Sequence, residues 1–149
     1  MKIKELDAVL RLYEGNFRNL HWNAVGIDFN DSHKSISTEY YEMVSDTIDA
    51  VAEIICMLGE NPCNYMEAID ILKASEKDYL VVESTKKYDR PSIVGYSNIM
   101  LNDICNLLSE CIEEINEPIN AGIRSELETQ LYNYTLQARY INARRLGNA

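Results

Sequence analysis

The stretch NDSHKSISTEYYEMVSDTIDAVAEIICMLG, residues 30–59, carries the longest helical pattern of the chain. Its apolar residues recur at intervals of three and four, which places them on one face of a helix. They are Ile36, Tyr40, Met43 or Val44, Ile48, Val51, Ile54 or Ile55, and Leu58. Asn30, Asp31 and Ser32 can cap its start. Gly59, followed by Pro62, ends it. A helix of this length spans roughly 40 Å at about 1.5 Å per residue, which is typical of a long helical bundle.

Similar patterns predict three more long helices. They cover residues 2–25 with a stop at Gly26, then from Pro91 through Ile115 to a break at Pro118, and finally about 121–146. A shorter helix is predicted for about 64–72, and residues 73–92 are predicted to form a linker with some local helix. Val81 and Val82 could begin a strand, but a single strand has no partner. These elements predict an all-α four-helix bundle, formed by one domain of residues 1–149, with a short extra helix in the connection between helices 2 and 3.

Composition and charge exclude several classes of protein. The chain of 149 residues is 46% hydrophobic and 26% charged, as expected for a globular protein. Its net charge of −10 opposes DNA binding, and three C-terminal arginines (139, 144 and 145) are too few to wrap DNA. No apolar run is long enough to cross a bilayer. The charged N-terminus lacks the features of a secretory signal, so we expect a cytoplasmic protein without a membrane partner. The four cysteines are expected to be reduced, small buried hydrophobes: Cys56, Cys63, Cys105 and Cys111.

The two histidines of the chain and two carboxylates are candidate metal ligands. His21 lies near the end of the first predicted helix and His33 in the first turn of the second, so the turn between them can bring both imidazoles near one point. Asp49 and Glu53 lie four residues apart and project from nearly the same helix face. Imidazole nitrogens and carboxylate oxygens suit iron, manganese or zinc. The residues alone leave a second interpretation open, with capping histidines and a solvated acidic face.

Two segments resemble the signature of the Dps proteins, or mini-ferritins. They are LHWNAVGIDFNDSH, residues 20–33, and DTIDAVAEIICMLGENP, residues 46–62. The resemblance implies a ferritin-like fold and a hollow shell of twelve subunits. It also implies that the protein oxidises Fe(II), typically with hydrogen peroxide, and stores ferric iron, which protects against oxidative stress. Iron is therefore the expected metal, and another divalent metal is an alternative.

The same resemblance implies a ferroxidase site at a two-fold subunit interface. His21 and His33 would come from one subunit. Asp49 and Glu53 would come from its partner, with Glu53 as the principal carboxylate. Trp22 would lie beside the site, as the tryptophan of the family does.

The chain departs from the family pattern in two ways. In the family an aspartate four residues after the second histidine is a ligand, but Ser37 stands at that position here. The later aspartate follows that histidine by sixteen residues instead of fifteen, so one residue is inserted. At roughly 100° per residue the insertion rotates the following face by about a third of a turn. We therefore predict a π-bulge between Lys34 and Asp46. Glu39 or Glu42 are candidates to replace the missing ligand.

These observations favour an iron-oxidising and iron-storing mini-ferritin without strong DNA binding. The alternative is a ferritin-like structural or interaction protein with a degenerate, non-catalytic metal site, which both departures favour. A di-metal bundle enzyme ranks last because the paired E-x-x-H motifs of such enzymes are missing. The acidic residues before the last helix, at 110, 113, 114 and 117, are more typical of a solvated face than of a pore.

Overall fold

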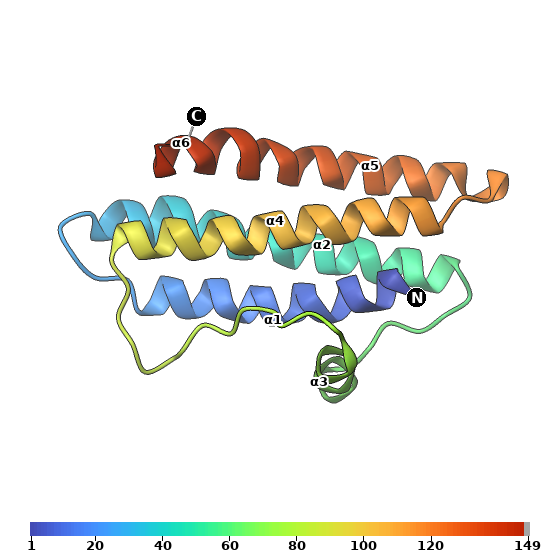
Figure 1. Ribbon diagram of the computed structural model, residues 1–149, viewed down its shortest axis with the longest axis horizontal. Coiled ribbons are helices and arrows are strands. Elements are labelled where there is room, and N and C mark those ends of the chain that lie inside the picture. Colours follow the sequence, from blue (N-terminus) through green and yellow to red (C-terminus); the bar gives the residue numbers. More distant parts are fainter. Residues whose placement is uncertain (148–149) are drawn as a thin grey trace.

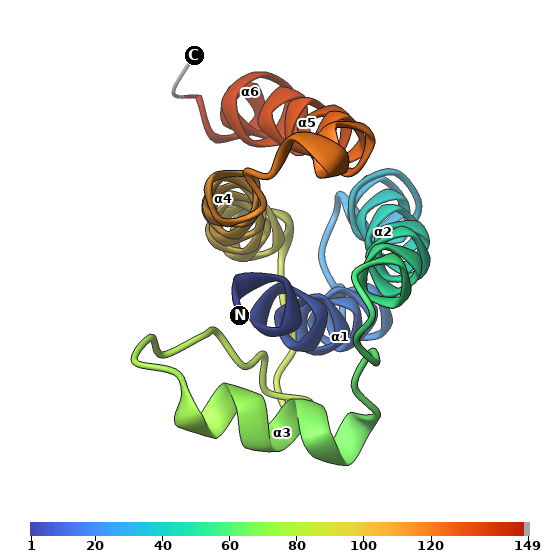
Figure 2. The same cartoon turned by 90° about the vertical axis from the view of Figure 1, so that its right-hand side faces the viewer.

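The computed structural model describes residues 1–147 and contains a bundle of long helices (Figure 1). The bundle is formed by α1 (Lys2–Trp22), α2 (Thr38–Met57), α4 (Arg90–Glu114) and α5 (Ala121–Leu136). In Figure 1, α1 and α5 run from right to left, whereas α2 and α4 run from left to right. The connection from α2 to α4 therefore crosses the length of the bundle. Seen from the end in Figure 2, the four helices surround a common centre.

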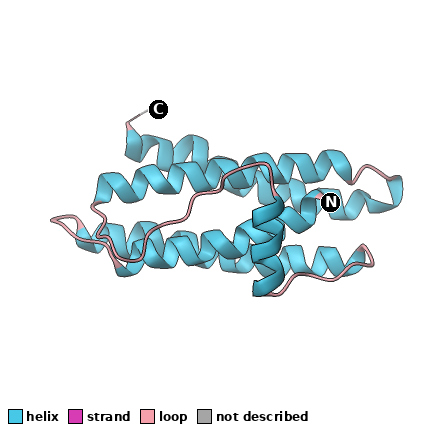
Figure 3. Ribbon diagram, turned by 60° about the horizontal axis from the view of Figure 1, so that its bottom comes forward, coloured by secondary structure: helices cyan, strands magenta, loops and turns pink. Residues whose placement is uncertain are grey.

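Five shorter elements complete the fold. The π-helix η1 (Asp31–Ser37) leads directly into α2, and α3 (Tyr65–Ala74) lies outside the bundle against α1 (Figure 2). A 3₁₀ turn, η2 (Pro118–Asn120), precedes α5. The π-helix η3 (Gln137–Ile141) and the short α6 (Asn142–Leu146) continue the line of α5. Residues 1–147 contain no strand (Figure 3). The predicted all-α four-helix bundle with a short helix in its second connection is confirmed.

One predicted helix boundary is wrong, and one predicted helix is interrupted. The first helix ends at Trp22 instead of residue 25, because the backbone of the next residues pairs with the linker. The N–H of Val25 donates to the carbonyl of Tyr88 over 2.9 Å, and the N–H of Tyr88 donates to Asn23 over 2.9 Å. The last predicted helix, 121–146, is interrupted by η3, where the backbone widens into a π-helix. The spacing of apolar residues predicts neither the backbone pairing that ends α1 nor the π-helix after α5.

Local sequence signals fix the starts of α3 and α4. The Asn64 side chain accepts from the backbone N–H of Glu67, and the Glu67 side chain accepts from the N–H of Asn64, which forms a capping box. Asp89 caps α4 by accepting from the N–H of Ser92, and Pro91 follows in the first turn of the helix. After α2 the chain turns at Gly59 with a φ of +80°, a conformation that glycine adopts without strain.

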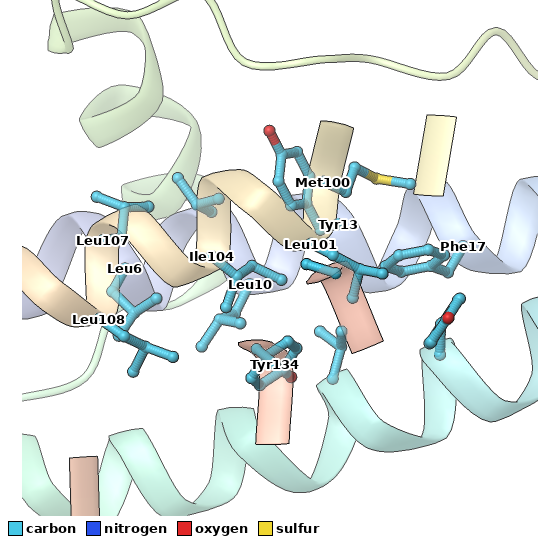
Figure 4. Close-up of a cluster of buried hydrophobic side chains, with 14 of the residues drawn as sticks. Leu6, Leu10, Tyr13, Phe17, Met100, Leu101, Ile104, Leu107, Leu108 and Tyr134 are labelled. Atoms are coloured by element: carbon cyan, nitrogen blue, oxygen red, sulfur yellow. The ribbon is translucent and has the colours of Figure 1, made fainter. Parts of the chain in front are cut away.

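The core runs the length of the bundle and is built from the predicted apolar faces. Figure 4 shows side chains of α1, α4 and α5 that meet between the helices. All of the labelled residues are buried: Leu6, Leu10, Tyr13, Phe17, Met100, Leu101, Ile104, Leu107, Leu108 and Tyr134. On α2, Val44, Val51 and Ile55 are fully buried, which confirms the register predicted for this helix. The expectation of buried cysteines holds for Cys111 and is wrong for Cys56, which is exposed on α2 because it lies outside the apolar face.

The linker between α3 and α4 lies along α1 without forming a strand (Figure 3). The side-chain amide of Asn16 holds it, because Nδ2 donates to the carbonyl of Leu80 over 2.7 Å and Oδ1 accepts from the N–H of Val82 over 3.1 Å. One buried amide thus supplies both hydrogen bonds that a neighbouring strand would otherwise provide. None of the helices in the described part of the chain is both long and apolar enough to span a membrane.

Candidate metal centre

The two histidines lie at one end of the bundle, on either side of the connection from α1 to η1. His21 is in the last turn of α1, and His33 is in η1. The chain between them turns at Gly26, whose φ is +109°. The pairing of residues 23–25 with Tyr88 fixes the start of this connection. A salt bridge of 2.8 Å between Asp31 and Arg90 joins the start of η1 to α4.

The imidazoles of His21 and His33 are stacked. Their ring centroids are 3.8 Å apart and the planes differ by 12°. Each ring also bonds to the backbone of the other residue. Nδ1 of His21 lies 2.8 Å from the carbonyl oxygen of His33, and Nδ1 of His33 lies 2.9 Å from the carbonyl oxygen of His21. The two residues therefore hold each other in place through two reciprocal hydrogen bonds.

These hydrogen bonds determine where each imidazole carries its proton. A carbonyl oxygen only accepts, so Nδ1 must be the donor in both rings. In the neutral ring Nε2 then carries the lone pair that can bind a metal. Among residues 1–147, no hydrogen bond reaches either Nε2. A histidine that binds metal through one nitrogen and donates its other N–H to a backbone carbonyl is the usual arrangement in metal sites.

Aromatic side chains enclose the two imidazoles. The ring of Phe29 stacks on His33 with centroids 4.8 Å apart. Tyr41 meets His21 edge to face at 5.3 Å, and the guanidinium of Arg18 lies over the ring of Tyr41 at 4.4 Å. Trp22 follows His21 in sequence, but its side chain is 65% exposed. The sequence analysis did not identify Phe29 or Tyr41. The only sequence feature that could have pointed to them is their spacing, four residues before His33 and eight residues after it.

Burial lowers the pKa of His21 from its usual value of 6.5, and the charges of His33 and Arg18 lower it further. The hydrogen bond to the His33 carbonyl acts in the opposite direction without reversing the shift. The neutral ring is therefore favoured at neutral pH, which is the form that binds a metal ion.

The structure contains a π-helix close to the predicted place. We predicted a bulge between Lys34 and Asp46, and η1 covers residues 31–37, so it overlaps that interval only at its start. As a result Ser37 is fully buried and donates to the carbonyl of Ser32 over 2.6 Å. The hydroxyl of Thr38 lies beside the imidazoles instead, 3.0 Å from Nδ1 of His21. The hydroxyl beside the imidazoles is therefore that of Thr38 and not that of Ser37, which stands where the aspartate was expected.

Neither glutamate considered as a replacement ligand forms a bond to the imidazoles. Glu39 accepts from Nε2 of Gln137 over 3.4 Å, and this directs it towards η3. Glu42 is exposed on α2 and forms no hydrogen bond or ion pair within residues 1–147. The missing carboxylate is thus not replaced by either residue in the conformation described.

Asp49 and Glu53 lie farther along α2. Asp49 follows Thr38 by eleven residues, about 16 Å at roughly 1.5 Å per residue. Both carboxylates are exposed, and neither forms a hydrogen bond or ion pair with any other described residue. Glu53 lines a groove of about 440 Å³ between α2 and α5, together with Glu126 and apolar residues such as Ile119. The structure therefore brings His21 and His33 together but leaves Asp49 and Glu53 apart from them within one chain.

Within residues 1–147, no three side chains of histidine, cysteine, aspartate or glutamate gather around one point that could hold a metal ion. The single chain thus presents two separate parts. One part is the imidazole pair with two free Nε2 atoms, and the other is the unpaired pair of carboxylates on the surface of α2.

Comparison with curated proteins finds relatives that match about half of this chain. The chain is 35% identical over 78 residues to the DNA protection during starvation protein of Helicobacter pylori, which covers 52% of each chain. It is 29% identical over 76 residues to antigen TpF1 of Treponema pallidum, across 48% of this chain and 42% of the relative. The chain therefore spans about half the length of the curated relatives it matches. No family model matches the sequence.

Solved structures match over nearly the whole chain. CAIP from Helicobacter cinaedi has a TM-score of 0.82 with 20% identity, covering 97% of this chain and 96% of the other. Dps from Listeria monocytogenes has a TM-score of 0.82 with 17% identity, covering 99% and 92%. Dps from Vibrio cholerae, described as one of the ferritin-like diiron-carboxylate proteins, has a TM-score of 0.79 with 19% identity, covering 95% and 85%. The predicted resemblance is confirmed: the chain is similar in sequence to a Dps protein over about half its length, and its fold is the ferritin-like four-helix bundle of Dps proteins.

Proposed function

We propose that this protein is a Dps-like mini-ferritin that binds and oxidises Fe(II) at a site shared between two copies of the chain. His21 and His33 of one copy would bind iron through Nε2, and Asp49 and Glu53 of a second copy would supply the carboxylates. The observation that carries the proposal is that neither the imidazole pair nor the carboxylate pair finds the other kind of ligand within one chain. The imidazoles are locked with Nδ1 protonated, and the carboxylates are exposed and unpaired.

The stacking of the rings supports paired binding of iron. A metal ion binds in the plane of an imidazole, about 2.1 Å from the nitrogen. The planes of His21 and His33 are nearly parallel, with their centroids 3.8 Å apart. A single ion cannot lie in both planes at that distance. Each ring therefore favours its own ion, and two-metal sites commonly hold their ions about 3.5–4 Å apart.

Two Fe(II) ions at such a site supply the two electrons that reduce hydrogen peroxide to water. Two Fe(II), one peroxide and two protons give two Fe(III) and two water molecules. Taking both electrons in one event avoids release of a hydroxyl radical. The products would then be stored as ferric iron inside a shell, proposed to contain twelve copies in the cytoplasm, and would no longer drive oxidative damage.

Exposed apolar side chains around the imidazoles support a second copy at this end of the bundle. Trp22 and Ile27 are 65% and 102% exposed, and Phe29 is 41% exposed. Apolar groups gathered at one place on a surface are typical of an interaction site. The net charge of −10 gives no support for strong DNA binding, in contrast to what the name of the Helicobacter pylori relative suggests for that protein.

A second candidate function has one observation in its favour. The residue beside the imidazoles is Thr38 and not a carboxylate, so the site has one anionic ligand fewer than the family pattern. A ferritin-like interaction protein that assembles but does not oxidise iron would fit this loss. The two candidates differ in one measurement, the rate of peroxide-dependent iron oxidation.

The experiment mixes purified protein with Fe(II) under anaerobic conditions, adds hydrogen peroxide and follows ferric absorbance. We expect a rate well above that of buffer, lost in His33→Ala. An equal rate with and without protein overturns the oxidation proposal and favours the second candidate. Light scattering on the same sample measures the number of copies in the assembly.

Mixed assemblies test whether the site is shared. One variant carries His21→Ala and His33→Ala, and the other carries Asp49→Asn and Glu53→Gln. Each is expected to be inactive alone. Random two-fold pairing gives half mixed dimers with one complete site of two, so the co-refolded mixture should recover about a quarter of wild-type activity. If all four ligands acted within one chain, the mixture would stay inactive.

A further inference from the structure

Two consecutive hydroxyl groups follow the spacing of the π-helix. Ser37 donates to the carbonyl of Ser32 over 2.6 Å, and Thr38 donates to the carbonyl of His33 over 2.6 Å. Both bonds reach back five residues, which is the hydrogen-bond spacing of a π-helix. Ser37 directs its hydroxyl to the buried side of η1. Thr38, one position later, directs its hydroxyl to the imidazoles.

The hydroxyl of Thr38 makes two hydrogen bonds, one as a donor and one as an acceptor. Its one proton is used in the bond to the carbonyl of His33. Towards Nδ1 of His21, 3.0 Å away, the oxygen can then only accept. Nδ1 of His21 thus has two acceptors, the Thr38 hydroxyl and the His33 carbonyl. Both require the proton on Nδ1 and leave Nε2 as the free nitrogen.

We propose that Thr38 is a positioning residue of the imidazole pair, which holds the ring of His21 through a second acceptor for its Nδ1–H and so orients its Nε2 outwards. The inference deepens the proposed function, since the outward Nε2 is the atom proposed to bind iron. The hydrogen bonds of His21 Nδ1 are a property of the metal-free protein and do not depend on iron chemistry.

Ring-¹⁵N histidine labelling tests this directly, because the chain has only two histidines. Solid-state NMR of the metal-free assembly at a pH at which both rings are neutral reports which nitrogen of each ring carries the proton. We expect both wild-type rings to be protonated at Nδ1. Thr38→Val keeps the shape and removes the hydroxyl. The His33 carbonyl still keeps the proton on Nδ1, but the Nδ1 resonance of His21 should shift because this N–H loses one of its two acceptors. Thr38→Ser should restore the wild-type spectrum.

Thr47→Val is the matched control on the same helix. The hydroxyl of Thr47 is also buried and bonded, 2.7 Å from that of Tyr134, but it lies away from the imidazoles. This variant should leave both histidine spectra unchanged. Should Thr38→Val fail to fold, Thr38→Ala carries the same readout. An unchanged His21 Nδ1 resonance in a folded Thr38 variant without the hydroxyl overturns the proposal, whatever its effect on activity.

Titration of the same proteins with Co(II) alone gives a second readout. Loss of a hydrogen bond behind a ligand typically weakens metal binding about 10- to 100-fold, so Thr38→Val should raise the Co(II) dissociation constant at least about tenfold. Thr38→Ser and Thr47→Val should stay near the wild-type value. Equal Co(II) affinity in wild type and Thr38→Val counts against the proposal. Failure of the wild type to oxidise iron would overturn the proposed function and leave the NMR result standing.

Discussion

The carboxylate of Asp7 on α1 holds Cys63, which lies 56 residues later in the loop before α3. One carboxylate oxygen accepts both the backbone N–H and the thiol of Cys63, at 2.9 and 3.1 Å. The other accepts Nε of Arg11 over 3.1 Å. Asp7 is fully buried, and the contact raises the pKa of the Cys63 thiol to about 11 through burial first and then through the neighbouring carboxylate. This one side chain therefore attaches the start of the long crossover to the bundle.

Replacing Asp7 with alanine should lower the free energy of unfolding by about 1–3 kcal/mol, because a partly buried N–H and a guanidinium lose their acceptor. Urea denaturation followed by circular dichroism, at one fixed protein concentration, measures the change. Asp70→Ala is the control, since Asp70 is an exposed aspartate on α3 with no bonded partner among the described residues. Equal losses in the two variants would show that the Cys63 contact contributes little.

Deleting Ser35 should be tolerated, because η1 accommodates one residue more than an α-helix needs. Ser35 is exposed, and its removal lets residues 31–38 continue α2 as an α-helix with both flanks in phase. Deleting Ser45 from the middle of α2 instead rotates the preceding face by roughly 100° and should disrupt the core. Thermal denaturation measures the unfolding midpoint of each deletion variant, and the midpoint should fall much further for the Ser45 deletion. A Ser35 deletion that is as damaging as the Ser45 deletion would contradict the role assigned to η1.

The stability of the protein should fall with pH below about 6.5, in part through His21. Burial holds the pKa of His21 below 6.5 in the folded chain, so the unfolded chain binds more protons just below that pH. The contribution of His21 is therefore fully present above 6.5 and is lost as the pH falls from there towards the folded pKa. His21→Gln, which retains an N–H donor, should lose less stability than wild type between about pH 7 and pH 5.5.

Denaturation at several pH values compares the two proteins. Burial raises the pKa of Glu5, but the hydrogen bonds from Tyr79 and Ser75 outweigh it, so the pKa lies below its usual value. Protonation of Glu5 therefore also lowers the stability of the protein on acidification. That loss occurs in both proteins and cancels in the difference. Parallel pH profiles for wild type and His21→Gln would show that His21 is not the source of the effect.

The fluorescence of Trp22 should report assembly, because it is the only tryptophan and its indole is 65% exposed in the single chain. If a second copy covers this end of the bundle, emission in the assembly should be blue-shifted relative to that of an exposed indole. Dilution or mild denaturant that dissociates the assembly should then move it to the red before the helices unfold. An emission maximum that stays constant during dissociation would place Trp22 outside the interface. Trp22→Phe should fold normally and lack the signal.

Helix register could be predicted from the sequence because it follows from repeated local spacing. The buried positions Val44, Val51 and Ile55 fall on the predicted face of α2. The resemblance to the Dps signature also implied that one residue is inserted before Asp49. It could not show where, because a count between two points does not locate the extra residue. The structure places it in η1, earlier than most of the predicted interval, and this exchanges Ser37 for Thr38 beside the imidazoles.

Contacts between segments far apart in the chain could not be predicted from the sequence. Asn16 holds the linker through hydrogen bonds to the backbone of Leu80 and Val82. In the sequence it is one polar residue of α1 among several, and nothing local distinguishes it. The reciprocal bonds of His21 and His33 depend on the path of the turn between them, and the pattern gave only their proximity. The sharing of ligands between copies came from the resemblance and stays a prediction.

The pairing of residues 23–25 with Tyr88 has a consequence for the order of folding. A ribosome delivers both histidines within the first 33 residues, yet the hydrogen bonds that fix the start of the turn between them come from a residue more than sixty positions later. Contacts of such long separation form late, because a large loop must close first. The turn between the histidines therefore gains this anchor only after the crossover has returned along the bundle, and a chain truncated before Tyr88 carries both histidines without it.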